Sequence, residues 1–386
     1  MDFRLGTAAE EFRAEVRAHL DSVMTQELEE KVYRTGVSHD LDFTQGLVAK
    51  GWLAPEYSNG LGSQGRSAME LQALHEELMR VEAPTYLLET TKMVAAIIRD
   101  VGTPLQQQRI LASAFRGETT IALGFTEPEC GSDVAAASTR AVRDGHEWII
   151  NGSKMFTTNG HVADYVFLLA RTDPTVAKHR GLTMFLVPLS HEGVEAQGVW
   201  TLSGERTNIT FYSDVRVSDE WRIGDIDGGW QVLLLSLEHE HASGWGQHLA
   251  RLLDHAQQWA HEPHDATGIP RIDDPDVRRR LARAAMDLEV SVLLERRGVW
   301  MGENGISATA EGPMSKLFST EALERAAQDI NELVGADALR SYFDPSAPQH
   351  GRFEQLLRFS LGTTIYAGTS EIQRSIIAER GLGLSR

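Results

Sequence analysis

The most informative segment of this chain reads Phe125-Thr-Glu-Pro-Glu-Cys-Gly-Ser-Asp133. It follows residues 120–125, a β-branched and apolar run that predicts a strand. Glycine lets a backbone approach a ligand closely, and hydroxyl and exposed N–H groups can bond a polar heterocycle. A second hydroxyl-rich loop with an aromatic ring follows as Lys154-Met-Phe-Thr-Thr-Asn-Gly160. Two such loops from one β domain could hold both edges of a flavin ring, although their spacing also allows two loops of no special role.

The periodicity of the chain changes twice. Apolar residues recur at helical spacing from the N-terminus, for example at Phe12, Val16 and Leu20. Short runs of β-branched and aromatic residues follow, and long amphipathic segments return after them. We therefore predict an α+β fold with three domains. They are a helical domain (1–119), a middle β domain (120–226) and a C-terminal helical domain (227–386).

The turns of the middle block indicate its topology. Asp144-Gly145 lies between two strand-like runs and predicts a hairpin. Asn151-Gly152 follows closely and predicts a second turn. The predicted strands are short and no helical pattern separates them, so we expect a β-barrel or sandwich and not βαβ units.

The composition excludes several classes of protein. The formal net charge of −18 disfavours binding to nucleic acids and to acidic membrane surfaces. Cys130 is the single cysteine of the sequence, so neither an internal disulfide nor a cysteine-rich metal site can form. No signal-peptide pattern and no apolar run of membrane-spanning length is visible. We expect a cytoplasmic protein.

The two loops resemble the signature segments of acyl-CoA dehydrogenases. The similarity continues in order along nearly the whole chain. It includes Ala163-Asp164, Ala170-Arg171, Phe185-Leu-Val187, Gly228-Gly-Trp230 and Ile365-Tyr-Ala-Gly-Thr-Ser-Glu-Ile-Gln-Arg374. The resemblance implies an N-terminal helical domain, a central β domain and a C-terminal four-helix bundle. It also implies FAD as cofactor, an acyl-CoA as substrate and electron-transferring flavoprotein as oxidant.

The resemblance assigns roles to individual residues. Phe156 stands where many members have tryptophan, which keeps an aromatic cover over the flavin. Ser132 is expected near both FAD and the pantetheine of CoA, and Gly368 near the substrate. The remaining cofactor contacts implied are Leu123, Phe125, Thr126, Gly131, Thr158, Thr369 and Glu371.

The catalytic base of the commonest family pattern is missing. Many members carry Tyr-Glu-Gly-Thr near the C-terminus, and this chain has Tyr366-Ala-Gly-Thr369. The backbone N–H of Ala367 survives the change and can still donate to a thioester carbonyl. Other members place the glutamate on the first helix after the β domain, which here reads Leu235-Ser-Leu-Glu-His239. The resemblance therefore makes Glu238 the candidate base, with a solvated helix glutamate as the alternative.

His239 stands where such members carry an arginine, and we expect it near the substrate. The run Glu238-His-Glu-His241 also invites a metal site. Histidines two residues apart point to different sides of a helix, and the sequence has no His-Glu-x-x-His motif. We predict no metal.

The segments that hold the adenine end of FAD in the family differ here. Arg-x-x-Phe-Gly is replaced by His264-Asp-Ala-Thr-Gly268, and Gly-Gly-x-Gly by Val334-Gly-Ala-Asp-Ala338. One explanation is that FAD is bound by substituted contacts or by a non-identical partner chain. The other is that FAD binding has weakened and the chain has become a structural subunit. The expected assembly is a homotetramer or a heterotetramer with a homologous subunit. A branched, cyclic or bulky acyl group is the expected substrate. The alternatives are a non-catalytic subunit and a flavin oxidase or monooxygenase on the same fold.

Overall fold

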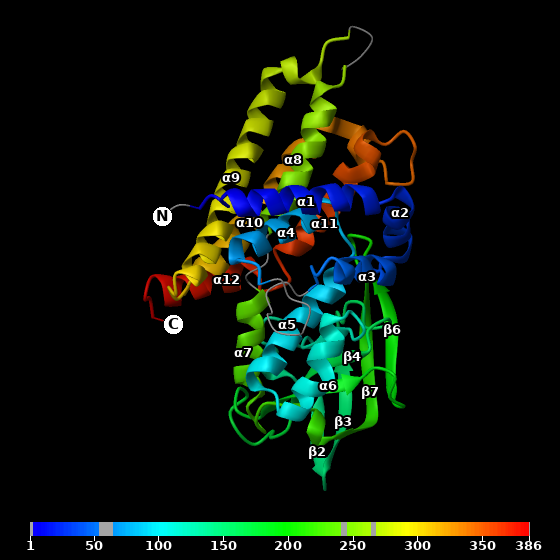
Figure 1. Ribbon diagram of the computed structural model, residues 1–386, viewed down its shortest axis with the longest axis vertical. Coiled ribbons are helices and arrows are strands. Elements are labelled where there is room, and N and C mark those ends of the chain that lie inside the picture. Colours follow the sequence, from blue (N-terminus) through cyan, green and yellow to red (C-terminus); the bar gives the residue numbers. More distant parts are fainter. Residues whose placement is uncertain (1–2, 54–64, 241–244, 264–267, 386) are drawn as a thin grey trace. The chain divides into compact units, whose positions relative to one another are not determined.

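The computed structural model describes residues 3–53, 65–240, 245–263 and 268–385. Helices come first, then strands, then helices again, in the order that the sequence predicts (Figure 1). The chain forms two compact units. The β unit holds Ser22–Ser67 and Ala83–Glu240. The helical unit combines Met1–Asp21, Ala68–Glu82 and His241–Arg386.

The β unit contains five α-helices besides its strands, within the described residues. The start of α6 shows how the sequence specifies one of them. Thr103 accepts a hydrogen bond from the Gln106 N–H, the Gln106 side chain accepts one from the Thr103 N–H, and Pro104 takes the first helical position. The helices are α2 (Gln26–Thr35), α3 (Leu41–Ala49), α5 (Tyr86–Val101), α6 (Pro104–Phe115) and α7 (Gly229–Glu240).

The strands of the β unit form one eight-stranded sheet with the order β6-β7-β3-β2-β4-β5-β8. β1 pairs in parallel with β4, whereas β2 and β3 form the antiparallel hairpin predicted at Asp144-Gly145. The strands are β1 (Ile121–Gly124), β2 (Arg140–Asp144), β3 (Glu147–Lys154), β4 (Tyr165–Arg171), β5 (Leu182–Pro188), β6 (Val194–Trp200), β7 (Arg206–Ser218) and β8 (Arg222–Ile223).

Both faces of β4 and β5 are buried. On β4, Phe167 and Leu169 pack in a core with Ile98 of α5 and Ile110 of α6. The alternating residue Leu168 packs in a second core together with side chains of β3, β5 and β7. Burial on two faces explains the continuous apolar run of β4, because alternation disappears when neither face meets water.

The prediction of a second turn at Asn151-Gly152 is wrong. Both residues lie within β3, where the pairing with β7 shifts register between Ile150 and Gly152. Gly152 has a φ of 148°, and a Cβ there would lie 2.6 Å from the Thr139 hydroxyl oxygen. Close packing against Thr139 therefore requires this glycine inside a bulged strand.

The helical unit is built around α8 (Gly246–His261), α9 (Pro275–Glu303), α10 (Glu311–Val334) and α11 (Arg352–Thr363). These four helices enclose one core, which includes Leu252, Leu281, Leu323 and Phe353. α1 (Thr7–Val23) and α4 (Ala68–Arg80) also belong to this unit, and α4 packs on α8 and α9. α12 (Ser370–Ile376) packs on α10 and ends in a π turn, Ile377–Gly381. None of the helices in the described ranges has an apolar stretch long enough to cross a bilayer.

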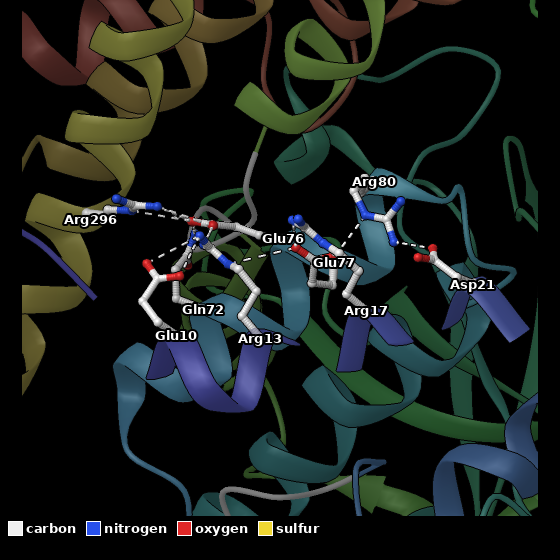
Figure 2. Close-up of polar contacts among 9 residues, drawn as sticks. All are labelled: Glu10, Arg13, Arg17, Asp21, Gln72, Glu76, Glu77, Arg80 and Arg296. Carbon is white, nitrogen blue, oxygen red and sulfur yellow. Dashed lines mark hydrogen bonds and ion pairs between the residues drawn. The ribbon is translucent and has the colours of Figure 1, made fainter. Parts of the chain in front are cut away.

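Charged side chains connect α1, α4 and α9 (Figure 2). Glu77 of α4 is buried and accepts hydrogen bonds from Arg17 of α1 at 2.6 Å and from Arg80 at 2.7 Å. Its neighbour Glu76 is paired with Arg13 of α1 and, at 3.3 Å, with Arg296 of α9. Removing one partner of a buried pair leaves the other charge uncompensated, so the network holds these helices in register.

We expect Glu77→Gln to destabilise the protein by about 1–3 kcal/mol at pH 7, because the buried side chain loses its charge-assisted hydrogen bonds from Arg17 and Arg80. Burial opposes ionisation of Glu77, but the hydrogen bonds from Arg17 and Arg80 outweigh it and lower its pKa. This stabilisation is therefore complete above about pH 4.5 and is lost as the pH falls through the depressed pKa.

Urea unfolding of both proteins at several pH values measures the effect. Glu10→Gln is the matched control. Glu10 contacts Arg13 from an exposed side chain, and such a pair contributes about 0–1 kcal/mol. Equal destabilisation by the two substitutions would contradict this account of the network.

Candidate functional site

The first loop (residues 125–133) leaves the end of β1 in the β unit. The pairing of β1 with β4 places Leu123 opposite Phe167. The Phe125 ring packs edge to face on Phe167, with 6.0 Å between ring centroids. Leu123, Phe125 and Thr126 are each half-buried. Three of the residues predicted to contact the flavin therefore lie together on a rigid strand end.

A fully buried ion pair connects the first loop to the second loop (residues 154–160). The Lys154 ammonium donates to the Glu127 carboxylate at 2.8 Å and to the Phe125 carbonyl at 3.1 Å. The Glu127 carboxylate also accepts from the backbone N–H groups of Ser138 and Thr139 at 2.7 and 2.9 Å. The lysine of one signature segment thus fixes the other segment, a role that no local sequence pattern indicates.

The charge state of this pair follows from its surroundings. Burial opposes ionisation of Glu127, but the Lys154 ammonium and the donors of Ser138 outweigh it and bring the pKa of Glu127 to about 2. Burial lowers the pKa of Lys154, and the Glu127 carboxylate opposes that effect. Lys154 is the one charged residue of its segment, but Glu127 is one of three acidic residues in the first segment, so the sequence does not single it out.

The second loop presents an aromatic ring to solvent. The Met155 N–H donates to the Thr126 carbonyl at 2.8 Å, which lays the two loops side by side. Phe156 then adopts a φ of 61°, and 54% of its surface is exposed. A left-handed conformation is unfavourable for a residue with a Cβ, and here it accompanies a ring held at the surface. Thr158 is half-buried, with its hydroxyl 3.3 Å from that of Thr207.

The glycine of the first loop borders open space. Gly131 and Ser132 are both exposed, and a Cβ built on Gly131 would meet no atom of the described residues within 4 Å. Seven of the predicted site residues thus gather at these two loops of the β unit. They are Leu123, Phe125, Thr126, Gly131, Ser132, Phe156 and Thr158.

In the helical unit, the loop 366–369 has an unusual backbone. Ala367 has a φ of 52° and Gly368 a φ of 83°. The Gln373 side chain donates to the Ala367 carbonyl at 2.9 Å, and the Lys316 ammonium donates to the Gly368 carbonyl at 2.6 Å. Within the part of the chain that the structure describes, the Ala367 N–H has no hydrogen-bond acceptor. A free N–H on a fixed loop is suited to bind a carbonyl oxygen.

A cavity of about 470 Å³ adjoins the same loop, within the helical unit. Thr369 and Glu371 both line it, as does Arg374, which pairs with Glu321 at 2.7 Å. The Ser370 hydroxyl at this wall is buried and has no hydrogen-bond partner among the described residues. The lining mixes hydroxyl, cationic and carboxylate groups, which suits a polar ligand with several oxygen atoms.

Glu238 and His239 lie near the end of α7, which packs on α5 and β5 in the β unit. Their side chains are outside the described part of the structure, so their predicted roles stay predictions. Residues 264–267 are outside it as well. The other divergent segment, Gly335–Leu339, forms a short 3₁₀ helix after α10.

The sequence matches known proteins along nearly its whole length. Residues 7–118 match the family "Acyl-CoA dehydrogenase, N-terminal domain". Residues 122–216 match the middle domain of the same family, and residues 227–382 match its C-terminal domain. The chain is 34% identical to acyl-CoA dehydrogenase FadE26 of Mycobacterium tuberculosis, over 98% of this chain and 97% of the relative.

Solved structures agree with the sequence matches. The Tcur3481-Tcur3483 steroid ACAD superimposes with a TM-score of 0.92 at 33% identity, and the match covers 100% of both chains. The ChsE4-ChsE5 complex from Mycobacterium tuberculosis superimposes with a TM-score of 0.90 at 32% identity, again over 100% of both chains. The helical N-terminal domain, the β domain and the helical C-terminal domain are all present. The chain belongs to the acyl-CoA dehydrogenase family of FAD-dependent enzymes.

Proposed function

We propose that this chain binds FAD and oxidises an acyl-CoA thioester between its α and β carbons, with Glu238 as the base. The observation that carries the proposal is the pair of loops connected by Lys154 and Glu127, which present Phe156 and Gly131 to open space. The exposed Phe156 ring and the open space at Gly131 fit a flat flavin ring. The Ser370 hydroxyl, which has no partner among the described residues, fits the polar part of a flavin nucleotide. When bound, FAD supplies the acceptor for the hydride that leaves the β-carbon.

Residues of the two loops and of the helical-unit cavity would hold the cofactor. In this proposal Leu123, Phe125 and Thr126 contact the pyrimidine side of the ring. Phe156 and Thr158 cover the ring and address its reactive nitrogen. The remaining contacts are Gly131 and Ser132 at the first loop and Thr369 and Glu371 at the cavity of the helical unit.

The α-proton of a thioester is weakly acidic, so its removal needs a base and a polarised carbonyl. The Glu238 carboxylate takes the α-proton in this proposal. The Ala367 N–H donates to the thioester carbonyl, with Gly368 beside the substrate. Ser132 and His239 complete the predicted substrate contacts. A solvated Glu238 with no catalytic role is the alternative.

We propose a branched, cyclic or otherwise bulky acyl group. Alanine at 367 leaves more room than the glutamate of the common pattern. The steroid ACAD among the similar structures supports the same substrate class. Electron-transferring flavoprotein is the proposed oxidant. We also propose that the protein assembles as a tetramer and is located in the cytoplasm.

A non-catalytic subunit of a heteromeric enzyme is the second candidate. The similar ChsE4-ChsE5 complex has two kinds of subunit, and the adenine-end segments of this chain depart from the common pattern. The two candidates differ in how the chain behaves when it is purified alone.

We expect the chain purified without a homologous partner to retain FAD in an amount equimolar with protein. The flavin absorbance of the native protein, compared with that of FAD released by denaturation, measures the content. A purified chain that is free of flavin, and that takes up FAD only after a homologous subunit is added, would favour the second candidate.

A further inference from the structure

We propose that Lys316 and Gln373 are positioning residues that hold the Ala367 N–H ready for the thioester carbonyl. This inference rests on the proposed function and deepens it. Neither residue belongs to the signature segments of the two loops, and neither replaces the missing base. Both act through the backbone of the loop 366–369.

The two side chains bond successive carbonyls of this loop. Gln373 Nε2 donates to the carbonyl of Ala367, and Lys316 Nζ donates to the carbonyl of Gly368. Each carbonyl belongs to the peptide unit that follows its residue, so the two bonds fix both peptide planes after Ala367. The Ala367 N–H lies in the preceding peptide unit, and the φ of 52° at Ala367 relates its direction to these fixed planes. The Thr364 carbonyl also accepts from the Ser370 N–H at 3.0 Å, which closes the loop at its ends.

The loop needs this support because its backbone is strained. Ala367 is held in the left-handed region, where its Cβ crowds the backbone. Such conformations persist when the surroundings over-determine them. With the carbonyls of Ala367 and Gly368 directed to buried donors, the Ala367 N–H remains without an acceptor among the described residues.

The donors themselves are rigidly placed. Lys316 and Gln373 are both completely buried, on α10 and α12. The Lys316 ammonium also lies 6.0 Å from the centre of the Trp245 ring, within range of a cation–π contact. A buried ammonium must keep its partners, so the position of the Gly368 carbonyl is set by the packing of α10.

The experiment compares Lys316→Met and Gln373→Met with the unchanged protein. Each substitution keeps an unbranched side chain of similar length and removes the donor. Ser319→Ala is the matched control. Ser319 is equally buried one turn further along α10, and its hydroxyl has no partner among the described residues.

Anaerobic mixing with an acyl-CoA that reduces the unchanged protein gives the first measurement. We expect the limiting rate of flavin reduction to fall about 10²-fold in each variant, because a small misplacement of a catalytic group has that effect. The half-saturating concentration of acyl-CoA and the FAD content should change little, because the N–H contributes mainly in the transition state. Ser319→Ala should keep the rate of the unchanged protein.

A 3-thia acyl-CoA gives a second measurement that a purely structural role would not change. Its sulfur replaces the β-carbon, so it can lose the α-proton but has no β-hydride to give. Its α-carbanion next to oxidised flavin produces a long-wavelength charge-transfer band. We expect the pH midpoint of this band to rise by about one to two units in the two variants, because a weaker N–H contact polarises the carbonyl less.

Unchanged rates and an unchanged midpoint in both variants would overturn the proposal. Loss of folding or of FAD in both would also overturn it, because the side chains would then be structural. If one variant folds and the other does not, the folded one decides by its midpoint. An unchanged protein that holds FAD but is reduced by no acyl-CoA would refute the proposed function instead.

Discussion

Replacing Glu238 by glutamine should lower the rate of flavin reduction by an acyl-CoA about 10²–10⁴-fold, since general-base catalysis contributes a factor of this size. Glutamine keeps the shape of the side chain and removes its basic carboxylate. The FAD content and the thermal stability should stay unchanged, because the substitution affects proton removal and not the two loops. Stopped-flow absorbance under anaerobic conditions measures the rate.

Glu240→Gln is the control for this prediction. Residue 240 follows two positions later in the sequence, a spacing of about 200° around an ideal helix. Glu240→Gln should therefore leave the rate of flavin reduction unchanged. A Glu238→Gln protein that is reduced as fast as the unchanged protein would remove Glu238 as the base and leave the alternative of a solvated glutamate.

The second large effect is expected at Lys154. Lys154→Met should destabilise the protein by about 3–5 kcal/mol at pH 7, because it leaves the buried carboxylate of Glu127 without its counter-charge. The two loops should also separate, so we expect loss of FAD. Urea unfolding and the flavin absorbance of the purified variant measure the two effects.

Two further variants separate the charge from the packing. Lys178→Met removes an exposed partner of Asp133 and should cost about 0–1 kcal/mol without loss of FAD. The double variant Glu127→Gln/Lys154→Met removes both charges and should recover part of the stability lost in Lys154→Met. If Lys154→Met bound FAD normally, the ion pair would not be what holds the two loops together.

Local sequence patterns predicted the elements whose signals are strong. The hairpin at Asp144-Gly145 was predictable from its turn residues. The same kind of turn signal was misleading at Asn151-Gly152. Gly152 is required there by close packing against Thr139 and not by a turn. β6 was not predicted, since none of its residues is buried and only Val194 and Val199 are β-branched.

Long-range partners were harder to predict. Lys154 and Glu127 both stood in recognised segments, but nothing local indicated that they pair across 27 positions. Likewise, Lys316 and Gly368 are 52 positions apart, and their contact depends on how α12 packs against α10. The packing of α4 with the C-terminal helices α8 and α9 follows from tertiary contacts that periodicity does not encode.

The residues proposed to hold the cofactor in the β unit could be named from the sequence because they follow one another in two short segments. The catalytic assignment was harder, since Ala367 shows where the common base is absent without showing where another lies. Glu238 rests on a motif of the resembled family and remains a prediction. Domain boundaries at 119 and 226 remain predictions for the same reason, because a change of periodicity does not fix the exact residue.

Anaerobic titration of the FAD-containing protein with a bulky acyl-CoA tests the central claim most directly. A CoA thioester of a steroid side chain is the first substrate to use. The account predicts that the flavin absorbance is bleached and that mass spectrometry finds an enoyl-CoA lacking two hydrogens. A flavin that stays oxidised with this thioester and with straight-chain and branched ones, while FAD remains bound, would contradict it.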